Sequence, residues 1–289
     1  MKTLFIIDAN SLIHRAYHAL PPFTSPSGKP SGAIYGVASI LLKILKDKKP
    51  DYIAAAFDRP EPTFRKEQYS EYKGTRAKAD DDLISQLIEA HNTFSQFNVK
   101  TYEMAGWEAD DIIVTLAKKF ASDQVRAVMF SGDMDLAQFV DGDKVILETP
   151  KKGIGEEVVY NEEAVIKRFG ILPKQLPDYK GLVGETSDNI PGVDGIGPKT
   201  AVELIKKYGT LEEMYKEIDE LGMSNLKLMK KLKESREIAL KSKMLATLRS
   251  DVPIAVSLDD IKTKPYSYEN LVKYFNDLGF QSLVGRIQR

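Results

Sequence analysis

Four short apolar segments, separated by stretches of helical periodicity, constrain the fold of this chain more than any other feature. They are KTLFIID (2–8), DYIAAAFD (51–58), RAVMFSGD (126–133) and DKVILE (143–148). Nearly continuous apolar runs of this length are typical of strands that are buried on both faces of a parallel sheet. Helical patterns lie at about 33–48, 81–97 and 109–121. We therefore predict an α/β fold with a mostly parallel sheet flanked by helices.

A change in pattern near residue 160 divides the chain. Beyond it the apolar runs stop, and helical patterns follow at about 162–169, 173–182, 198–207, 211–219, 224–246 and 267–278. We expect an α/β core over residues 1–160 and a helical subdomain over residues 161–289. Within the core, the segment 21–32 is rich in Pro, Ser and Gly, which predicts a loop.

Composition limits the metals that the chain could bind. It has no cysteine, which excludes disulfides and Cys-ligated zinc or iron–sulfur centres. Its three histidines, His14, His18 and His91, lack the H-E-x-x-H spacing of a zinc site. A metal would therefore be bound by oxygen, which favours Mg²⁺ or Mn²⁺. Asp8 interrupts the N-terminal apolar run and no run is long enough to span a membrane, so we expect a cytoplasmic protein.

Three of the four predicted strands end in aspartate. Asp8, Asp58 and Asp133 take these positions, and Asp135 follows two residues after the last of them. In an open α/β sheet the site lies outside the carboxyl ends of the strands, so these side chains should gather at one edge. An aspartate at the end of a strand is also an ordinary turn residue. That explanation accounts poorly for matching positions on three strands.

The motif WEADDI places Glu108, Asp110 and Asp111 at the start of a predicted helix. Acidic residues in a first turn offset the helix dipole, as the aspartates at 80–82 would do, so an acidic cluster alone does not define a site. At about 100° per residue, however, the three acids fan around the helix end instead of forming one solvated stripe. This arrangement favours a role in binding a metal.

Glu185 and Asp188 in the motif GETSDN bring the number of candidate metal ligands to nine. The nine are Asp8, Asp58, Glu108, Asp110, Asp111, Asp133, Asp135, Glu185 and Asp188. Two like charges 4 Å apart repel by about 4 kcal/mol at an effective dielectric constant of 20. Several such pairs would exceed the roughly 5–15 kcal/mol net stability of a domain. If the acids converge, either some are protonated or divalent cations lie among them.

The charge distribution makes a polyanion plausible as the partner. The formal net charge is −1, so the rest of the chain carries +8 once the nine candidate ligands are set aside. The segment 63–78 interleaves basic and aromatic residues, which is typical of surfaces that bind single strands. The segment 224–249 carries eight basic and two acidic residues and could contact duplex phosphates. A solvated helix face is the competing interpretation for both segments.

Glycines precede a predicted helix in the motif NIPGVDGIGPKTA. Gly192, Gly195 and Gly197 permit close backbone approach, while Lys199 and Thr200 stand at the helix N-terminus, where N–H groups bind phosphate. The spacing matches neither the dinucleotide-binding fingerprint nor the P-loop. From these residues alone, an ordinary turn between helices is an equally good explanation.

Together these segments resemble the 5′-nuclease (flap endonuclease) family, and within it the N-terminal 5′-to-3′ exonuclease domains of bacterial DNA polymerases I. The motifs that carry the resemblance follow the family's order along essentially the whole chain. They are IIDANSLIHRAYHALPP, AFDRPEPTFR, YKGTRA, WEADDI, GDMDLAQ and GETSDNIPGVDGIGPKTA. The resemblance implies a PIN-like fold with a helical arch at about 70–97 and a helix-three-turn-helix at about 182–207.

The resemblance also implies roles for individual residues. A two-metal Mg²⁺ site, in which Mn²⁺ substitutes, would use as ligands or supporting residues Asp8, Asp58, Glu108, Asp110, Asp111, Asp133, Asp135 and Asp188. Tyr72, Lys73 and Arg76 would engage the scissile phosphate region, with Arg15 as a further basic site residue. The helix-three-turn-helix would grip one duplex strand, with a K⁺ ion on its backbone carbonyls. Glu185 replaces the family's usual aspartate, which predicts altered geometry or affinity at the second metal.

We therefore predict a divalent-metal-dependent, structure-specific DNA 5′ nuclease of replication and repair, which is both a 5′-flap endonuclease and a 5′-to-3′ exonuclease. Its partner would be flapped duplex DNA with a 5′ single strand. We expect a monomer near the bacterial nucleoid, either free-standing or with a polymerase domain in cis. Two alternatives stay open: a branched-DNA-binding module without turnover, and a PIN-like RNase. A small-molecule phosphatase would leave the basic segments unexplained.

Overall fold

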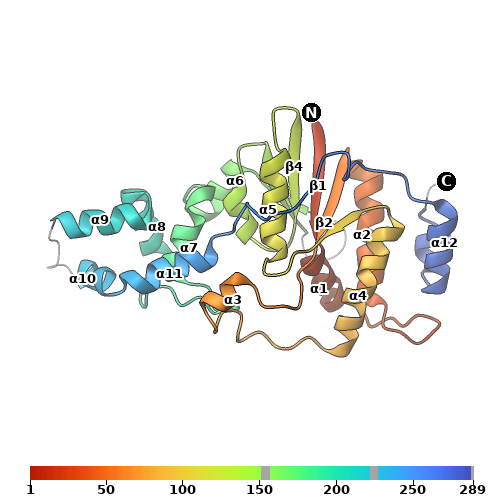
Figure 1. The fold of residues 1–289 in the computed structure, drawn as a ribbon, viewed down its shortest axis with the longest axis horizontal. Coiled ribbons are helices and arrows are strands. Elements are labelled where there is room, and N and C mark those ends of the chain that lie inside the picture. The colour runs from red at the N-terminus through yellow and green to blue at the C-terminus, as the bar shows by residue number, and fades with distance from the viewer. Residues whose placement is uncertain (151–156, 222–226, 288–289) are drawn as a thin grey trace.

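A six-stranded sheet forms the centre of the molecule. The computed structural model describes residues 1–150, 157–221 and 227–287. The strand order is β3-β2-β1-β4-β5-β6 (Figure 1). The strands are β1 (Lys2–Asp8), β2 (Tyr52–Ala56), β3 (Lys100–Tyr102), β4 (Val125–Phe130), β5 (Val145–Pro150) and β6 (Glu157–Tyr160). All neighbouring strands are parallel except β5 and β6, so the predicted mostly parallel sheet is confirmed.

The register brings the carboxyl ends of three strands to one edge of the sheet. Asp8 of β1 lies beside Ala56 of β2, and Ile7 lies beside Phe130 of β4. The four predicted strands are confirmed as β1, β2, β4 and β5. The sequence pattern missed β3 and β6, because β3 has three residues and β6 is a short antiparallel strand whose Val159 is exposed.

Helices cover both faces of the sheet because side chains alternate along β1. Leu4 and Ile6 share a core with α5, whereas Phe5 and Ile7 share the opposite core with α1 and α2. The helical elements around the sheet are α1 (Ala9–Ala19), α2 (Gly32–Lys43), the π-helical turn η1 (Ile44–Lys48), α3 (Phe64–Gln68), α4 (Asp81–Gln96) and α5 (Ala109–Phe120). The three helices predicted in this part are therefore present as α2, α4 and α5, with η1 as the last turn of the first.

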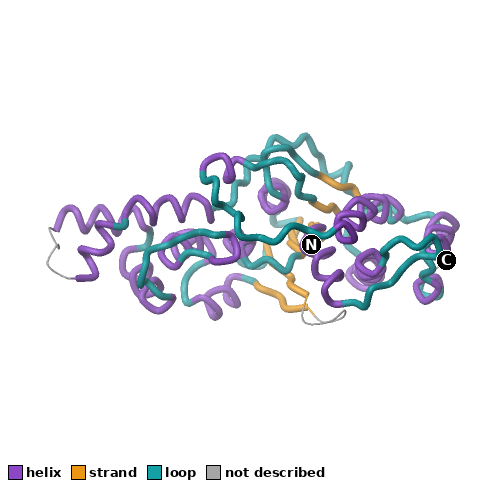
Figure 2. The backbone as a smooth tube through the Cα atoms, turned by 90° about the horizontal axis from the view of Figure 1, so that it is seen from below, coloured by secondary structure: helices purple, strands orange, loops and turns teal. Residues whose placement is uncertain are grey.

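A helical extension continues the molecule beyond the sheet, with α9 and α10 at its far end, and gives it the elongated shape seen in both views (Figures 1 and 2). Its α-helices are α6 (Glu162–Phe169), α7 (Leu176–Val183), α8 (Pro198–Tyr208), α9 (Leu211–Leu221), α10 (Lys227–Glu234) and α11 (Arg236–Ala246). Three 3₁₀ turns also matter for the site: η2 (Asp135–Phe139), η3 (Pro173–Gln175) and η4 (Thr186–Asp188). None of the helices in the described ranges is long and apolar enough to cross a membrane.

The predicted helix 224–246 differs from the structure. Its first three residues, 224–226, lie outside the described residues, and the rest forms two helices instead of one. Ser235 separates them with φ −99° and ψ 12°, which is outside the helical range. Its N–H still donates to the carbonyl groups of Lys231 and Leu232, so the break is a tight turn between α10 and α11.

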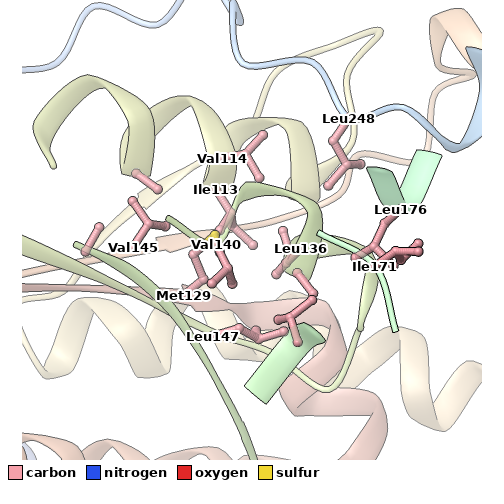
Figure 3. Packing of buried hydrophobic residues seen from close by; sticks show 14 of the residues in the cluster. Ile113, Val114, Met129, Leu136, Val140, Val145, Leu147, Ile171, Leu176 and Leu248 are labelled. Atoms are coloured by element: carbon pink, nitrogen blue, oxygen red, sulfur yellow. The ribbon is translucent and has the colours of Figure 1, made fainter. Parts of the chain in front are cut away.

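One hydrophobic core joins the sheet to the helical extension. In Figure 3, Ile171, Leu176 and Leu248 lie close to Leu136, and all four belong to the same buried cluster as Ile113 of α5. Because this core is continuous, the packing holds α7 and η4 at a defined position relative to the sheet edge.

The C-terminal segment returns from the helical extension to the α/β part. Ile53 N–H of β2 donates to Ile261 O at 2.8 Å. Beyond it, α12 (Tyr268–Asp277) and α13 (Gln281–Val284) add Leu271 and Phe275 to the core that contains α2. In Figure 1, α12 accordingly lies at the opposite end from α9. The division into 1–160 and 161–289 stays a prediction.

The segment expected to form a helical arch, about 70–97, is helical only from Asp81 onward. Residues 69–80 form turns and extended backbone, and residues 74–82 are exposed. Residues 74–80 are charged, polar or small and have no apolar face to bury, so packing cannot stabilise a helix there. The helical part, α4, packs on α1 and α2.

Candidate metal and phosphate site

A pocket at the carboxyl ends of the strands collects most of the predicted ligands. It has a volume of about 570 Å³, and its lining combines residues that follow β1, β2 and β4 with residues of α7 and η4. The predicted ligands in this lining are Asp8, Asp58, Asp110, Asp133, Asp135, Glu185 and Asp188. The structure thus brings seven of the nine predicted ligands to one cavity and leaves Glu108 and Asp111 outside its lining.

Four of these carboxylates come from the sheet edge and the first turn of α5, and we call them the strand-end group. They are Asp8, Asp58, Asp110 and Asp133. Asp8 is buried, and its carboxylate accepts hydrogen bonds from Ser131 Oγ at 2.6 Å and from Ser11 N–H at 2.9 Å. Burial raises the pKa of Asp8 to about 7, and the neighbouring charges of Asp58 and Asp133 add to the rise against the two hydrogen bonds.

Asp110 is held close to the strand ends through the start of its helix. Ala109 N–H donates to Asp58 Oδ1 at 2.8 Å, so the aspartate that follows β2 caps the turn that carries Asp110. Burial raises the pKa of Asp110, and the charges of Asp133 and Asp8 raise it further. Raised pKa values with these causes indicate carboxylates whose charges repel one another when no cation separates them.

The second set of carboxylates lies toward the helical extension, and we call it the cation-paired group. It consists of Asp135, Glu185 and Asp188 of the pocket lining and of Glu108, which lies outside that lining and pairs with Lys73. Lys180 Nζ, from α7, contacts Asp135 Oδ1 and lies 2.7 Å from Glu185 Oε2. Burial lowers the pKa of the Lys180 ammonium, but the two adjacent carboxylates outweigh burial and raise the pKa above its ordinary value. These two carboxylates therefore carry their own side-chain cation.

The other half of the cation-paired group is bound by Tyr72, Lys73 and Arg76. Lys73 Nζ lies 3.1 Å from Glu108 Oε1, and Arg76 pairs with Asp188. Tyr72 OH lies 3.1 Å from Glu108 Oε2 and 3.3 Å from Asp188 Oδ2. Lys73 N–H also donates to Asp188 O at 2.9 Å, so the whole segment is fixed to η4. The side chain of Arg76 is 51% exposed and lies on the rim of the pocket.

Asp111 faces away from the pocket and into a buried ion pair. Its two oxygens accept hydrogen bonds from Arg65 at 2.7 and 2.8 Å, and one of them also accepts from Arg249 N–H at 2.8 Å. Arg65 is fully buried and also donates to Leu245 O and Thr247 O. Arg65 belongs to the segment 63–78, for which contacts to single strands were predicted, but its buried guanidinium group is inaccessible and cannot make such a contact. Both oxygens of Asp111 thus accept hydrogen bonds from Arg65 and one also from a backbone N–H, and its predicted role at the metal stays a prediction.

The sequence analysis missed several polar residues that line the pocket, among them Asn10, His14, Lys180 and Arg168. Asn10 and His14 were recognisable in principle, because α1 starts directly after Asp8 and its first turns must lie at the same edge. Lys180 and Arg168 carried no such signal, since their place depends on how the helical extension packs. Arg15, which was predicted in the site, lies on α1 and is not part of this lining.

The glycine loop before α8 has the backbone conformation that its glycines allow. Gly192 has φ +64° and Gly195 has φ +70°, which are left-handed values. A Cβ atom on Gly192 would lie 2.3 Å from the backbone nitrogen of Gly184, so this close approach requires glycine. Gly197 is extended and forms the N-cap of α8. The close approach at Gly192 is therefore to the chain's own backbone at Gly184.

A second hollow of about 430 Å³ lies beside the N-terminus of α8. Lys199 and Lys206 line it together with Arg168 and Tyr179, and the last two residues also line the main pocket. Lys199 is exposed, whereas Thr200 is half-buried. A basic surface therefore continues from the acidic pocket to the glycine loop.

The pocket fits divalent cations by the chemistry of its donors. As the side chains stand, no three Asp, Glu or His residues in the described parts of the chain are arranged to hold an ion. The acidic donors are all carboxylate oxygens, which hard cations such as Mg²⁺ and Mn²⁺ prefer. The ammonium of Lys180 already bridges Asp135 and Glu185, which shows that a cation is accommodated between them.

The fold and the pocket define a class of protein whose acidic residues stand at the edge of a mostly parallel sheet beside a basic rim. Two family descriptions match the chain: "5′-3′ exonuclease, N-terminal resolvase-like domain" over residues 3–170, and "5′-3′ exonuclease, C-terminal SAM fold" over residues 171–269. The chain therefore belongs to the 5′-3′ exonuclease family.

Relatives of two lengths match the chain. DNA polymerase I of Bacillus subtilis is 41% identical over 286 residues, which cover 99% of this chain and 32% of the relative. The chain thus spans about a third of the length of the DNA polymerase I relatives. A 5′-3′ exonuclease of Aquifex aeolicus is 35% identical over 289 residues, which cover 100% of this chain and 96% of the relative.

Solved structures share the fold. A flap endonuclease of bacteriophage T5, in a complex with DNA and metal ions, has a TM-score of 0.66 at 21% identity and covers 99% of this chain and 96% of its own. The catalytic core of Rad2, in a complex with DNA substrate, has a TM-score of 0.64 at 18% identity, with coverage of 99% and 93%. Both comparisons support the assignment of the fold.

Proposed function

We propose that the chain hydrolyses phosphodiester bonds near the 5′ end of branched DNA, with Mg²⁺ in the pocket and Mn²⁺ as a substitute. The observation that carries this proposal is the single cavity in which the strand-end group faces a cation-paired group and a basic rim. The Aquifex aeolicus relative, which matches along nearly its whole length, is named a 5′-3′ exonuclease. The bacteriophage T5 flap endonuclease was solved with DNA and metal ions, which supports the same assignment.

Some residues of the pocket would bind the metal ions, and others would bind the scissile phosphate. Bound divalent cations would activate water and stabilise the leaving oxygen of the phosphodiester bond. Asp8, Asp110 and Asp133 would hold them, with Asp8 oriented by its two hydrogen bonds and Asp110 by the cap on α5. Lys73 and Arg76 would exchange their carboxylate partners for oxygens of the scissile phosphate and neutralise its charge.

The glycine loop and the N-terminus of α8 would hold the duplex next to this pocket. Lys199 is exposed there, and backbone N–H groups at a helix start bind phosphate. We assign a K⁺ ion to the backbone carbonyls of the same loop. In α10 and α11 the basic surface is smaller than the sequence suggests, because Lys231 pairs with Asp194 and Arg236 pairs with Asp219.

The proposed setting is a cytoplasmic protein near the bacterial nucleoid that acts as a monomer on flapped DNA. The match to one third of DNA polymerase I relatives supports a polymerase domain in cis in such proteins. The full-length match to the Aquifex aeolicus relative supports a free-standing nuclease equally well.

A 5′-flap duplex with labelled strands tests the proposal. With Mg²⁺ we expect release of the flap, and with EDTA we expect binding without release. Asp110→Asn should abolish release, whereas Asp82→Asn, an exposed acid at the start of α4, should not change it. Binding without hydrolysis at any concentration of Mg²⁺ or Mn²⁺ would favour the binding module without turnover. Equal cleavage of RNA and DNA flaps would favour the RNase.

A further inference from the structure

We propose that Lys180 is an internal cation that competes with a divalent ion for Asp135 and Glu185, so that an ion binds between them only after Lys180 has left. The inference rests on the proposed function, since it requires the pocket to bind divalent ions. It assigns Lys180 a role in setting how tightly the second of two ions is held.

The contacts show that the ammonium occupies a ligand position. Lys180 Nζ contacts Asp135 and lies 2.7 Å from Glu185 Oε2, and the three side chains are 15%, 13% and 25% exposed. A partly buried ammonium between two carboxylates neutralises part of their repulsion, as a metal ion would. One oxygen of Asp135 and one of Glu185 therefore already contact a cation before any metal ion arrives.

Packing allows the Lys180 side chain to leave but holds its backbone in place. A Cβ atom on the next residue, Gly181, would lie 2.8 Å from Leu211 Cδ1 and 3.0 Å from Ala239 O, so α7 lies in close contact with its neighbours. Glu185 is fixed by two backbone hydrogen bonds with Ile190, of 2.8 and 2.9 Å. The competition is therefore decided by rotation of one flexible lysine side chain in an open cavity of about 570 Å³.

The strand-end group is different in this respect. Lys73, Arg76 and Lys180, which line the same pocket, form their ion pairs with the cation-paired group. A first divalent ion in the strand-end group would relieve repulsion without displacing any of these three cations. A second ion would have to displace Lys180, and its apparent affinity would equal the intrinsic affinity multiplied by the fraction of molecules in which Lys180 has left the pair. We therefore expect two binding steps of unequal affinity.

Binding of Mn²⁺ to the whole chain without DNA, followed by electron paramagnetic resonance of the free ion, measures both steps. For the wild type we expect a tight and a weak class. Lys180→Met should tighten the weak class by at least about tenfold and leave the tight class unchanged. Lys174→Met, a nearby exposed lysine outside the pocket, is the matched control and should change neither class. An unchanged or weaker second class in a folded Lys180→Met variant would overturn the inference.

A second measurement on the wild type covers the case in which Lys180→Met does not fold. Lysine side-chain ¹H–¹⁵N spectra, with Lys180→Arg used to assign the signal, follow the ammonium during a Mg²⁺ titration. The Lys180 signal should move during the weak binding step and stay in place during the tight one. A Lys180 signal that is still unchanged when Mg²⁺ saturates both sites would overturn this inference and leave the proposed function standing. Absence of any Mn²⁺ binding to the wild type would overturn the proposed function as well.

Discussion

The two halves of the pocket differ in how their carboxylates are compensated. In the strand-end group, burial and neighbouring acids raise the pKa values of Asp8 and Asp110. In the cation-paired group, Lys73, Arg76 and Lys180 pair with acids within the chain itself, although burial and the charges of Asp133 and Glu185 still raise the pKa of Asp135 to about 7. In the described parts of the chain, the sheet edge and the start of α5 thus gather the acids of the strand-end group, which have no side-chain cation paired with them, whereas Lys73 and Arg76 of the segment before α4 and Lys180 of α7 pair with the other acids.

The same contrast separates two adjacent residues of α5. Asp110 faces the pocket with other acids, and Asp111 faces Arg65 in the interior. A helix turns about 100° per residue, so neighbours along the chain face different surroundings. We therefore expect a substitution of Asp110 to reduce catalysis and a substitution of Asp111 to reduce stability.

The largest expected effect is on catalysis in the strand-end group. Asp110→Asn keeps the shape of the side chain and removes its charge, so cleavage of a 5′ flap should fall by about a thousandfold or more because the cations are no longer held. Binding of the flap in EDTA should stay within about twofold of the wild type. Asp82→Asn serves as the control. Cleavage at the wild-type rate by Asp110→Asn would show that the strand-end group does not hold the catalytic cations.

The change Asp111→Ala should act on stability first. It leaves the buried guanidinium of Arg65 with only Glu108, 3.3 Å away, as a carboxylate partner, and breaking a buried ion pair typically costs about 3–5 kcal/mol. Urea unfolding should show this loss, while cleavage by the folded fraction at low temperature stays within about tenfold of the wild type. A thousandfold loss of cleavage in a stable Asp111→Ala protein would instead place Asp111 among the metal ligands.

In the cation-paired group, Lys73→Met should lower kcat by about a hundredfold, because one cation at the scissile phosphate is lost. KM for the flap should change less, since the duplex is held elsewhere. Single-turnover kinetics separate the two quantities. An effect confined to KM would assign Lys73 to binding and not to the chemical step.

A smaller effect should appear in the protein without metal. Asp133→Asn removes one charge from the strand-end group, so the metal-free variant should be more stable than the wild type by about 1 kcal/mol, or roughly 2–4 °C in Tm. Added Mg²⁺ should stabilise the wild type more than the variant. Calorimetry with EDTA or Mg²⁺ measures both differences. A metal-free variant that is less stable would show that repulsion in this group is unimportant.

The smallest effect is expected outside the pocket. Lys199→Ala should weaken duplex binding and reduce the slope of log K against log salt concentration by up to about one unit, as for the loss of one phosphate contact. Cleavage at saturating DNA should be unchanged. The slope comes from binding in EDTA at several salt concentrations, and an unchanged slope would remove Lys199 from the duplex contacts.

The sequence predicted the part of the site that depends on strand direction alone. Asp8, Asp58 and Asp133 follow parallel strands, so their convergence needs no knowledge of side-chain packing. Which way Asp110 and Asp111 point could not be decided, because both interpretations place acids at a helix start. Only the buried position of Arg65, which is fixed by contacts 180 residues apart along the chain, separates them.

The positions that sequence reasoning missed depend on long-range packing. Lys180 comes within reach of Asp135 because α7 packs on the core that also holds Leu136. The family resemblance predicted a helix over the segment 74–80, yet this segment has no apolar face to bury and is exposed and not helical. The local periodicity of the sequence does not show how distant helices pack or which segments find a surface to pack on.

Anomalous diffraction from crystals soaked in graded concentrations of Mn²⁺ tests the central claim most directly. The account predicts a first peak among Asp8, Asp110 and Asp133 at the lowest concentration that gives any signal. A second peak, beside Asp135 and Glu185, should appear only at higher concentration and together with movement of the Lys180 side chain. A first peak beside Asp135 and Glu185, or no peak in the pocket at any concentration, would contradict it.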